Sequence, residues 1–348
     1  MNPRSNGPRF TLCATYKAAA RAAEELSRHD TLILDCEGRE LGWPGGALSI
    51  IAIGDSTASR IFLFDTLSLS DKRHPLLLPL FALLRRSDVV KVVWDGRSDF
   101  LEIAGTYGVY MEGVLDLQLV EVAQRARRGH NKKGGRRAKH TVDYFKKLKG
   151  EPLAAFDGIH RLFGLEQCAG FYQLLHGNGG KDPAVTAMHQ ENQSDMWMQR
   201  PLPPPLLRYS AHDIEMIALV YDRFGPGKQG NYLKPFQELM AMSARYMQAY
   251  PTRELRALHV PLDLCRFLPL DVLTAPPAGG ARYRCARCER MLSLPCFLTT
   301  HVQATPAGSR GRGGASNSQP LVRLSLCRLC DLLARRNAER IVREWIEI

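Results

Sequence analysis

The order of strand and helix patterns between residues 31 and 125 constrains the fold of this chain more than any other feature. Apolar segments rich in β-branched residues alternate there with amphipathic segments of helical period. The segments, in order, are the strands 31–36, 47–55 and 60–66, the helix 74–86, the strand 89–94, the helix 97–108, and 114–125, which begins as a strand and becomes a helix. This βββαβαβα succession predicts an α/β protein with a mixed sheet and helices packed on it.

Beyond residue 125 the patterns predict a more helical region and then a small terminal module. Helical periodicity recurs up to residue 248, and the stretch DLLARRNAERIVREWIEI at the end reads as an amphipathic helix. A Gly/Ser-rich insert at 305–320 interrupts the terminal module. We therefore expect a tail and helix at 1–29, a main domain at 30–225 with a basic loop at 125–140, a helical extension and linker at 226–281, and a module at 282–348.

The positive charge of the chain is concentrated in two segments. The net charge is +12, and residues 125–149 hold eleven Lys or Arg beside a single Asp, while 282–348 hold twelve Arg and five acids. A mildly acidic body with two basic segments favours a polyanionic partner such as nucleic acid. No segment is apolar enough to predict a membrane span, and the polar N-terminus lacks a signal-peptide pattern. We expect a nuclear or cytoplasmic protein.

Acidic residues recur at the ends of the expected strands and on two helices. Asp35 and Glu37 end the first strand on one face, and Asp99 opens the helix that follows VVKVVW. Tyr209 and Asp213 lie four residues apart, on one face of a helix. Each alone has an ordinary explanation: a solvated strand end, a carboxylate favoured by a helix dipole, or a core tyrosine.

Taken together, the four carboxylates predict a metal-dependent hydrolytic site. Carboxylates that face one cavity repel each other unless cations compensate their charge. Two Mg²⁺ or Mn²⁺ ions about 4 Å apart would satisfy them and support an in-line displacement at a phosphodiester. The phenol of Tyr209 would then hydrogen-bond to the attacking water and orient it.

The motifs, in their order and local sequence, resemble the ribonuclease D-like branch of the DEDD 3′–5′ exonucleases, the Tyr-containing subtype, and its eukaryotic exonuclease-domain proteins. LILDCEG, KVVWDGRSDFLEI and RYSAHDI look like the three motifs, and Asp116 stands at a commonly acidic position. Over roughly residues 30–225 the resemblance implies an RNase H-like fold, with two metals held by Asp35, Glu37, Asp99 and Asp213. Two features depart from the family: Trp94 replaces a frequent His, and a long span precedes Tyr209.

The basic loop between the second and third motifs is a candidate nucleic-acid contact. Its lysines and arginines would contact phosphates without reading base sequence. A solvated charge run or a weak nuclear-localisation signal is the alternative interpretation. The candidate contact residues are Arg127, Arg128, Lys132, Lys133, Arg136 and Arg137.

Two C-x-x-C pairs in the terminal module predict a structural zinc site. Cys285, Cys288, Cys327 and Cys330 would supply the four thiolates that tetrahedral Zn²⁺ favours. Four protein ligands leave no open position for catalysis, so we expect a structural metal. Cys296 and His301 are further candidates, and whether either joins the site is left open.

The sequence thus predicts a metal-dependent 3′–5′ exonuclease that hydrolyses nucleic acid, with RNA or single-stranded 3′ ends as the favoured substrates. One alternative is a catalytically silent adaptor that binds nucleic acid or protein and keeps the fold. A complete set of four carboxylates argues against this alternative. A DNA-processing enzyme is the third hypothesis, because contacts to a ribose 2′-hydroxyl cannot be identified from the sequence.

Overall fold

The computed structural model describes residues 9–130, 139–148, 150–175, 180, 185, 187, 194–225, 235–301 and 320–348. The chain forms two compact units. The first comprises Met1–Asn131 and Leu162–Ala257, and the second Lys132–Arg161 and Leu258–Ile348. Among the described helices, none is both long and apolar enough to cross a bilayer.

A mixed six-stranded sheet forms the centre of the first unit. Its strands lie in the order β1 (Phe10–Cys13), β4 (Ile61–Asp65), β3 (Ala47–Asp55), β2 (Thr31–Arg39), β5 (Val90–Val93) and β6 (Val114–Asp116). Strands β2, β3 and β4 form an antiparallel meander, and β5 and β6 continue the sheet in parallel. The predicted α/β fold with a mixed sheet is therefore confirmed.

Strand β1 was not expected from the sequence, where residues 1–29 were assigned to a tail and a helix. Phe10–Cys13 pairs in parallel with β4 at the edge of the sheet. Only the side chain of Cys13 is buried in this four-residue strand. So short a segment, buried at one position, carries no periodicity from which a strand could be predicted.

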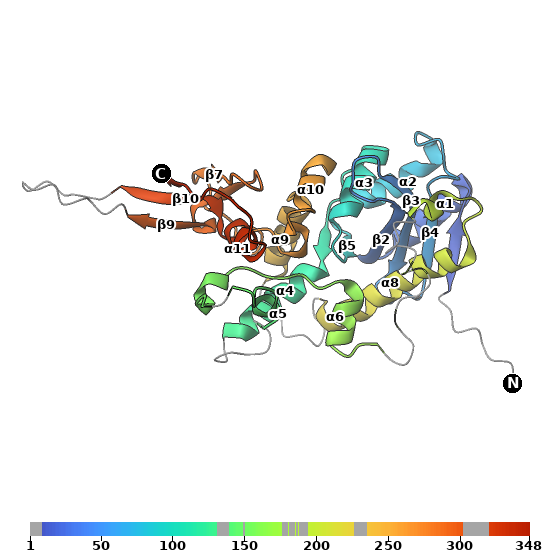
Figure 1. Cartoon of the computed structure of the whole chain (residues 1–348). Coiled ribbons are helices and arrows are strands. Elements are labelled where there is room, and N and C mark those ends of the chain that lie inside the picture. Colours follow the sequence, from blue (N-terminus) through green and yellow to red (C-terminus); the bar gives the residue numbers. More distant parts are fainter. Residues whose placement is uncertain are drawn as a thin grey trace, which may run out of the picture. The chain divides into compact units, whose positions relative to one another are not determined.

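Helices pack on the sheet of the first unit, and α8 (Pro204–Phe224) positions the third motif. It contacts β2, β3 and β4, and Figure 1 draws it as a long yellow helix beside the blue strands. It begins at Pro204, where a proline costs no hydrogen bond. Gly54 of β3 allows the close approach, since a Cβ there would lie 2.7 Å from the Ile214 side chain.

The remaining helices follow the predicted order along the chain. In the described residues they are α1 (Tyr16–Leu26), α2 (Leu78–Arg85), α3 (Arg97–Tyr107), α4 (Leu117–His130), α5 (Lys139–Tyr144), α6 (Leu165–Phe171), α8 (Pro204–Phe224), α9 (Phe236–Met247), α10 (Arg253–His259) and α11 (Arg328–Arg336). Short 3₁₀ turns lie at Pro75–Leu77, Leu153–Phe156, Ser194–Met198, Leu264–Arg266 and Leu294–Cys296.

The second unit is built from two small sheets and helix α11 around its own core. Strands β7 (Arg282–Arg284) and β8 (Met291–Ser293) form one sheet, and β9 (Phe297–His301), β10 (Leu321–Cys327) and β11 (Trp345–Glu347) form the other. Figure 1 draws β9 and β10 as a pair of orange arrows. Five cysteines and Phe145 belong to the apolar core of this unit.

The predicted C-terminal helix ends much earlier than expected. We predicted helix through residue 348, but α11 ends at Arg336, and the chain returns as strand β11 beside β10. Ala338 adopts a left-handed conformation with φ of +54°, which helical residues do not have. The Glu339 carboxylate then pairs with Arg287 at 2.6 Å, which holds the reversed chain against the module.

Candidate active site and cysteine cluster

Three of the predicted metal ligands meet at one point of the first unit. Asp35 and Glu37 extend from the same face of β2, and Asp213 comes from α8. One carboxylate oxygen of each residue lies within 4.8 Å of the others. Glu37 and Asp213 are buried, at 7% and 4% exposure, whereas Asp35 is half-buried. Anionic oxygens this close repel each other unless a cation or a proton lies between them.

Asp99 lies in the same electrostatic environment, although it is not part of the three-oxygen group. It occupies the first turn of α3 and is buried at 5% exposure. Burial raises the pKa of Asp99 well above its usual range, and the charges of Asp35 and Asp95 raise it further. The positive charge of Arg256 acts in the opposite direction. Burial and the two negative charges thus favour a proton on Asp99, and a bound cation would take the place of that proton.

The thiol of Cys36 stands between the two carboxylates of β2 in the sequence but is no candidate nucleophile. It lies on the opposite face of the strand and is buried. Burial, followed by the charges of Asp99, Asp35 and Glu37, raises its pKa well above its usual range. The group therefore stays a neutral thiol, and a neutral thiol is a poor nucleophile.

Tyr209 lies one turn before Asp213 on α8, as the four-residue spacing predicted. Its side chain is 8% exposed, and its ring meets Trp197 edge to face with centroids 6.2 Å apart. Ser49 of β3 donates a hydrogen bond to the Trp197 carbonyl, and Arg200 donates to the same oxygen at 2.9 Å. Arg200 in turn pairs with the buried Asp65 at 2.7 Å. The segment before α8 thus fixes one side of the tyrosine.

Glu102 is a residue of this region that the sequence analysis missed. It is fully buried, accepts a hydrogen bond from the Gly42 backbone at 2.8 Å, and pairs with Arg253 at 2.8 Å. These contacts tie the loop that follows β2 to helix α3. Glu102 lies three residues after Asp99 and so near the same helix face, and this spacing is a signal that could have identified it.

The predicted nucleic-acid contacts cannot be placed around this site. Arg127 and Arg128 belong to α4, but their side chains are outside the described part of the chain. The four others are outside the described residues altogether: Lys132, Lys133, Arg136 and Arg137. Their proposed role therefore stays a prediction from sequence.

The four predicted zinc ligands come together in the second unit. The Sγ atoms of Cys285, Cys288, Cys327 and Cys330 all lie within 4.8 Å of one another, and all four residues are buried. Tetrahedral thiolates bound at about 2.3 Å from one ion would lie about 3.8 Å apart, so the cluster fits zinc. Hydrogen bonds from the neighbouring cysteines lower the pKa of Cys285 far below its usual range.

Cys296 and His301 lie outside this group of four. Cys296 donates instead to the Asp271 carboxylate at 3.0 Å, and burial, followed by that carboxylate, raises its thiol pKa to about 12. His301 is an exposed residue at the end of β9. A hydrogen bond within the cluster also supports it, because the Cys327 backbone N–H donates to Cys285 Sγ at 3.2 Å.

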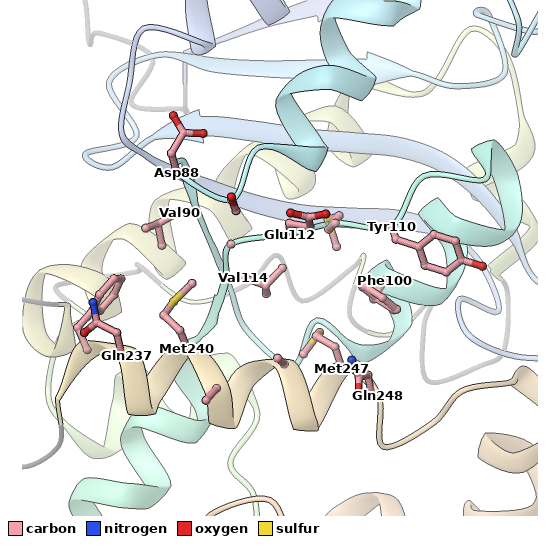
Figure 2. Close-up of a pocket in the computed structure, with 16 residues that line it drawn as sticks. Asp88, Val90, Phe100, Tyr110, Glu112, Val114, Gln237, Met240, Met247 and Gln248 are labelled. Carbon is pink, nitrogen blue, oxygen red and sulfur yellow. The ribbon is translucent and has the colours of Figure 1, made fainter.

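A separate cavity of about 900 Å³ lies between α9 and the edge of the sheet formed by β5 and β6. Figure 2 shows Met240 and Met247 of α9 on one side and Val90 and Val114 on the other. The predicted catalytic residues do not line it. It is mostly apolar, without the converging carboxylates that metal-dependent chemistry requires.

Comparison with known proteins agrees with the geometry of the first unit. Residues 10–133 match the family model described as 3′–5′ exonuclease. The fold resembles RNase D of Trypanosoma brucei with 21% identity and a TM-score of 0.54, over 70% of this chain and 73% of that one. Its complex with the RNA U12 gives 22% identity and a TM-score of 0.52, over 70% and 71%. Among curated proteins, none matches.

Proposed function

We propose that this chain is an active exonuclease that removes nucleotides from RNA 3′ ends, because residues 10–133 match the 3′–5′ exonuclease family model and the fold resembles that of RNase D. The observation that carries the proposal is the convergence of Asp35, Glu37 and Asp213 within 4.8 Å. A fold kept only for binding would have no need to concentrate repelling carboxylates in a buried position.

The donor set fits two divalent cations, Mg²⁺ or Mn²⁺. All four candidate ligands are carboxylates, the ligand type that these hard cations prefer. Bound there, the ions would lower the pKa of the attacking water and stabilise the charge of the leaving 3′ oxygen. Asp35, Glu37, Asp99 and Asp213 would hold the ions and orient the scissile phosphate.

Tyr209 would position the attacking water. Its place one turn before Asp213 keeps the phenol on the ligand face of α8. Packing against Trp197 restricts the rotation of the ring, so that the hydroxyl keeps one direction. A fixed hydrogen-bond acceptor holds a water molecule in line with the scissile bond, which lowers the entropic part of the barrier.

RNA is the proposed substrate class, and a solved relative and the charge distribution of the chain support it. The solved relative in the comparison includes a complex with the RNA U12. Two basic segments of this chain, 125–149 and 282–348, would contribute contacts to the phosphate backbone. We propose that the four-cysteine cluster binds one structural Zn²⁺ that holds the second basic segment in its folded form.

The test is degradation of 5′-labelled single-stranded RNA and DNA of equal sequence with Mg²⁺ or Mn²⁺. We expect a ladder of products shortened from the 3′ end, faster on RNA. Asp35→Ala and Asp213→Ala should abolish it, whereas Asp222→Ala, an exposed acid on the same helix α8, should not. RNA binding without cleavage by the parent would refute the enzyme and favour the adaptor.

A further inference from the structure

The turn between β5 and α3 precedes Asp99, and contacts from several other elements support it. Asp95 has a left-handed backbone with φ of +55°, an uncommon conformation for a residue other than glycine. Gly96 is the N-cap of α3 and has no side chain to accept a hydrogen bond from the first turn. The turn therefore depends on groups from other elements.

Asp116, at the end of the neighbouring strand β6, accepts hydrogen bonds from the backbone of the turn. Its carboxylate is fully buried and accepts the backbone N–H groups of Asp95 at 3.3 Å, Gly96 at 3.0 Å and Gln118 at 2.9 Å. Its own backbone N–H donates to Ser243 of α9 at 3.0 Å. One side chain thus joins the ends of two adjacent strands and fixes the start of α3.

Helix α9 holds the same turn from a second side. Arg97 is 3% exposed and pairs with the Asp95 carboxylate through two nitrogens. Its guanidinium lies 4.5 Å from the ring centroid of Tyr246 and 5.2 Å from that of Tyr250. Burying the Arg97 guanidinium away from water is costly, and the aromatic faces compensate part of that cost.

The Tyr246 hydroxyl completes the connection. It donates to Gln118 Oε1 at 2.6 Å and lies 3.4 Å from the Asp95 carboxylate. Gln118 is itself held by the Phe163 carbonyl at 2.8 Å. Tyr246 therefore contacts Asp95, Arg97 and Gln118 from a helix that the sequence motifs do not include.

We propose that Tyr246 and Asp116 are positioning residues of the metal site: they fix the Asp95–Arg97 turn and so aim the Asp99 carboxylate at its cation. The proposal rests on the metal-dependent function proposed above. Residues that orient a metal ligand set the affinity for the metal as well as the rate, and their loss typically costs about 10- to 100-fold.

The two faces of α9 allow a clean control. Ser243 and Tyr246 face β6 and α4, whereas Met240, Ala244 and Met247 line the separate cavity (Figure 2). Met240→Leu therefore perturbs the packing of the same helix without touching the turn. Tyr172→Phe removes another hydroxyl, one that donates to Glu121 at 2.9 Å on α4.

The experiment measures Mn²⁺ binding to the full, zinc-loaded chain by calorimetry, with RNA cleavage against Mn²⁺ concentration as a second readout. We expect Tyr246→Phe and Asp116→Asn each to weaken Mn²⁺ binding roughly tenfold and to raise the Mn²⁺ concentration for half-maximal cleavage equally. The KM for RNA at saturating Mn²⁺ should stay at the parent value. Met240→Leu and Tyr172→Phe should bind Mn²⁺ like the parent.

Two results would overturn the proposal. Parent-like Mn²⁺ affinity in both test variants, with only a lower melting temperature, would make Tyr246 and Asp116 purely structural residues. A parent that binds no Mn²⁺ would remove the site and the proposed function together. A parent that binds Mn²⁺ but cleaves no RNA would refute the proposed function alone, because the binding measurements would still decide the positioning role.

Discussion

The carboxylate site and the cysteine cluster bring acidic groups equally close together, yet they differ in how they are built. The four cysteine Sγ atoms lie within 4.8 Å of one another, and so do oxygens of Asp35, Glu37 and Asp213, three of the four candidate carboxylates. The cysteines come as two C-x-x-C pairs and are all buried, whereas the carboxylates come from β2 and α8, and Asp35 is half-buried. A closed set of four soft ligands suits a structural ion, and an open set of hard ligands suits an ion that meets substrate.

This difference predicts that metal removal unfolds the second unit, whereas in the first unit it removes activity and leaves the fold intact. A strong chelator that strips zinc should unfold the second unit, because structural zinc contributes on the order of 10 kcal/mol to the folding of such modules. Cys330→Ser should do the same, and Cys265→Ser, a half-buried cysteine outside the cluster, should not. Thermal melts followed by circular dichroism provide the measurement. Chelation that leaves a single unchanged melt would place no zinc in the cluster.

In the first unit, loss of a ligand should remove activity but not the fold. Asp213→Ala should lower the rate of RNA cleavage on the order of 10³-fold, equal to about 4 kcal/mol of transition-state stabilisation. Without metal the variant should melt no lower than the parent, because it relieves repulsion with Asp35 and Glu37. Single-turnover cleavage and differential scanning fluorimetry measure the two effects. A strongly lowered melting temperature would mean that Asp213 has a structural role instead.

Tyr209→Phe separates orientation of the water from binding of the metal. The ring would keep its edge-to-face contact with Trp197, and only the hydroxyl would be lost. We expect kcat to fall about 100-fold while the Mn²⁺ affinity stays at the parent value, since positioned proton-transfer groups typically contribute that much. The opposite result, a weaker affinity for Mn²⁺ with an unchanged kcat, would assign Tyr209 to the metal site.

The cysteine cluster and the carboxylate site also differ in how far the sequence predicts them, because the first is built from local pairs and the second from separate elements. The C-x-x-C spacing is local, so the cysteine cluster could be identified without knowing the fold. The carboxylates could be identified because each lies at a strand end or on one helix face, and because their order resembles a known family. The supports of Asp99 could not be predicted: Asp116 acts from a neighbouring strand and Tyr246 from α9, which is 151 residues from Asp95 along the chain.

The C-terminal strand was missed for a related reason. The segment after Arg336 has an amphipathic helical pattern, and nothing local marks the left-handed turn at Ala338. The turn is stabilised by partners far away in the sequence, among them the Arg287–Glu339 pair. Long-range contacts of this kind override helix propensity, which is a weak local preference.

The last expected effect is a pH dependence of stability. It should appear in the first unit, which contains the buried Asp116. Burial and the charge of Asp95 raise the pKa of Asp116 to about 7 in the folded protein, against an ordinary value near 3.9 in the unfolded chain. The folded state then binds the proton more tightly, so this contribution to stability is complete below pH ~4 and is lost as the pH rises toward 7. The loss should be on the order of 1 kcal/mol per pH unit over that window. Urea unfolding of the zinc-loaded chain without Mg²⁺ or Mn²⁺ between pH 5 and 8 measures it, and Asp116→Asn should flatten the dependence. An equally steep dependence in the variant would assign the effect to other carboxylates, Asp99 first among them, and Mn²⁺ should then suppress it.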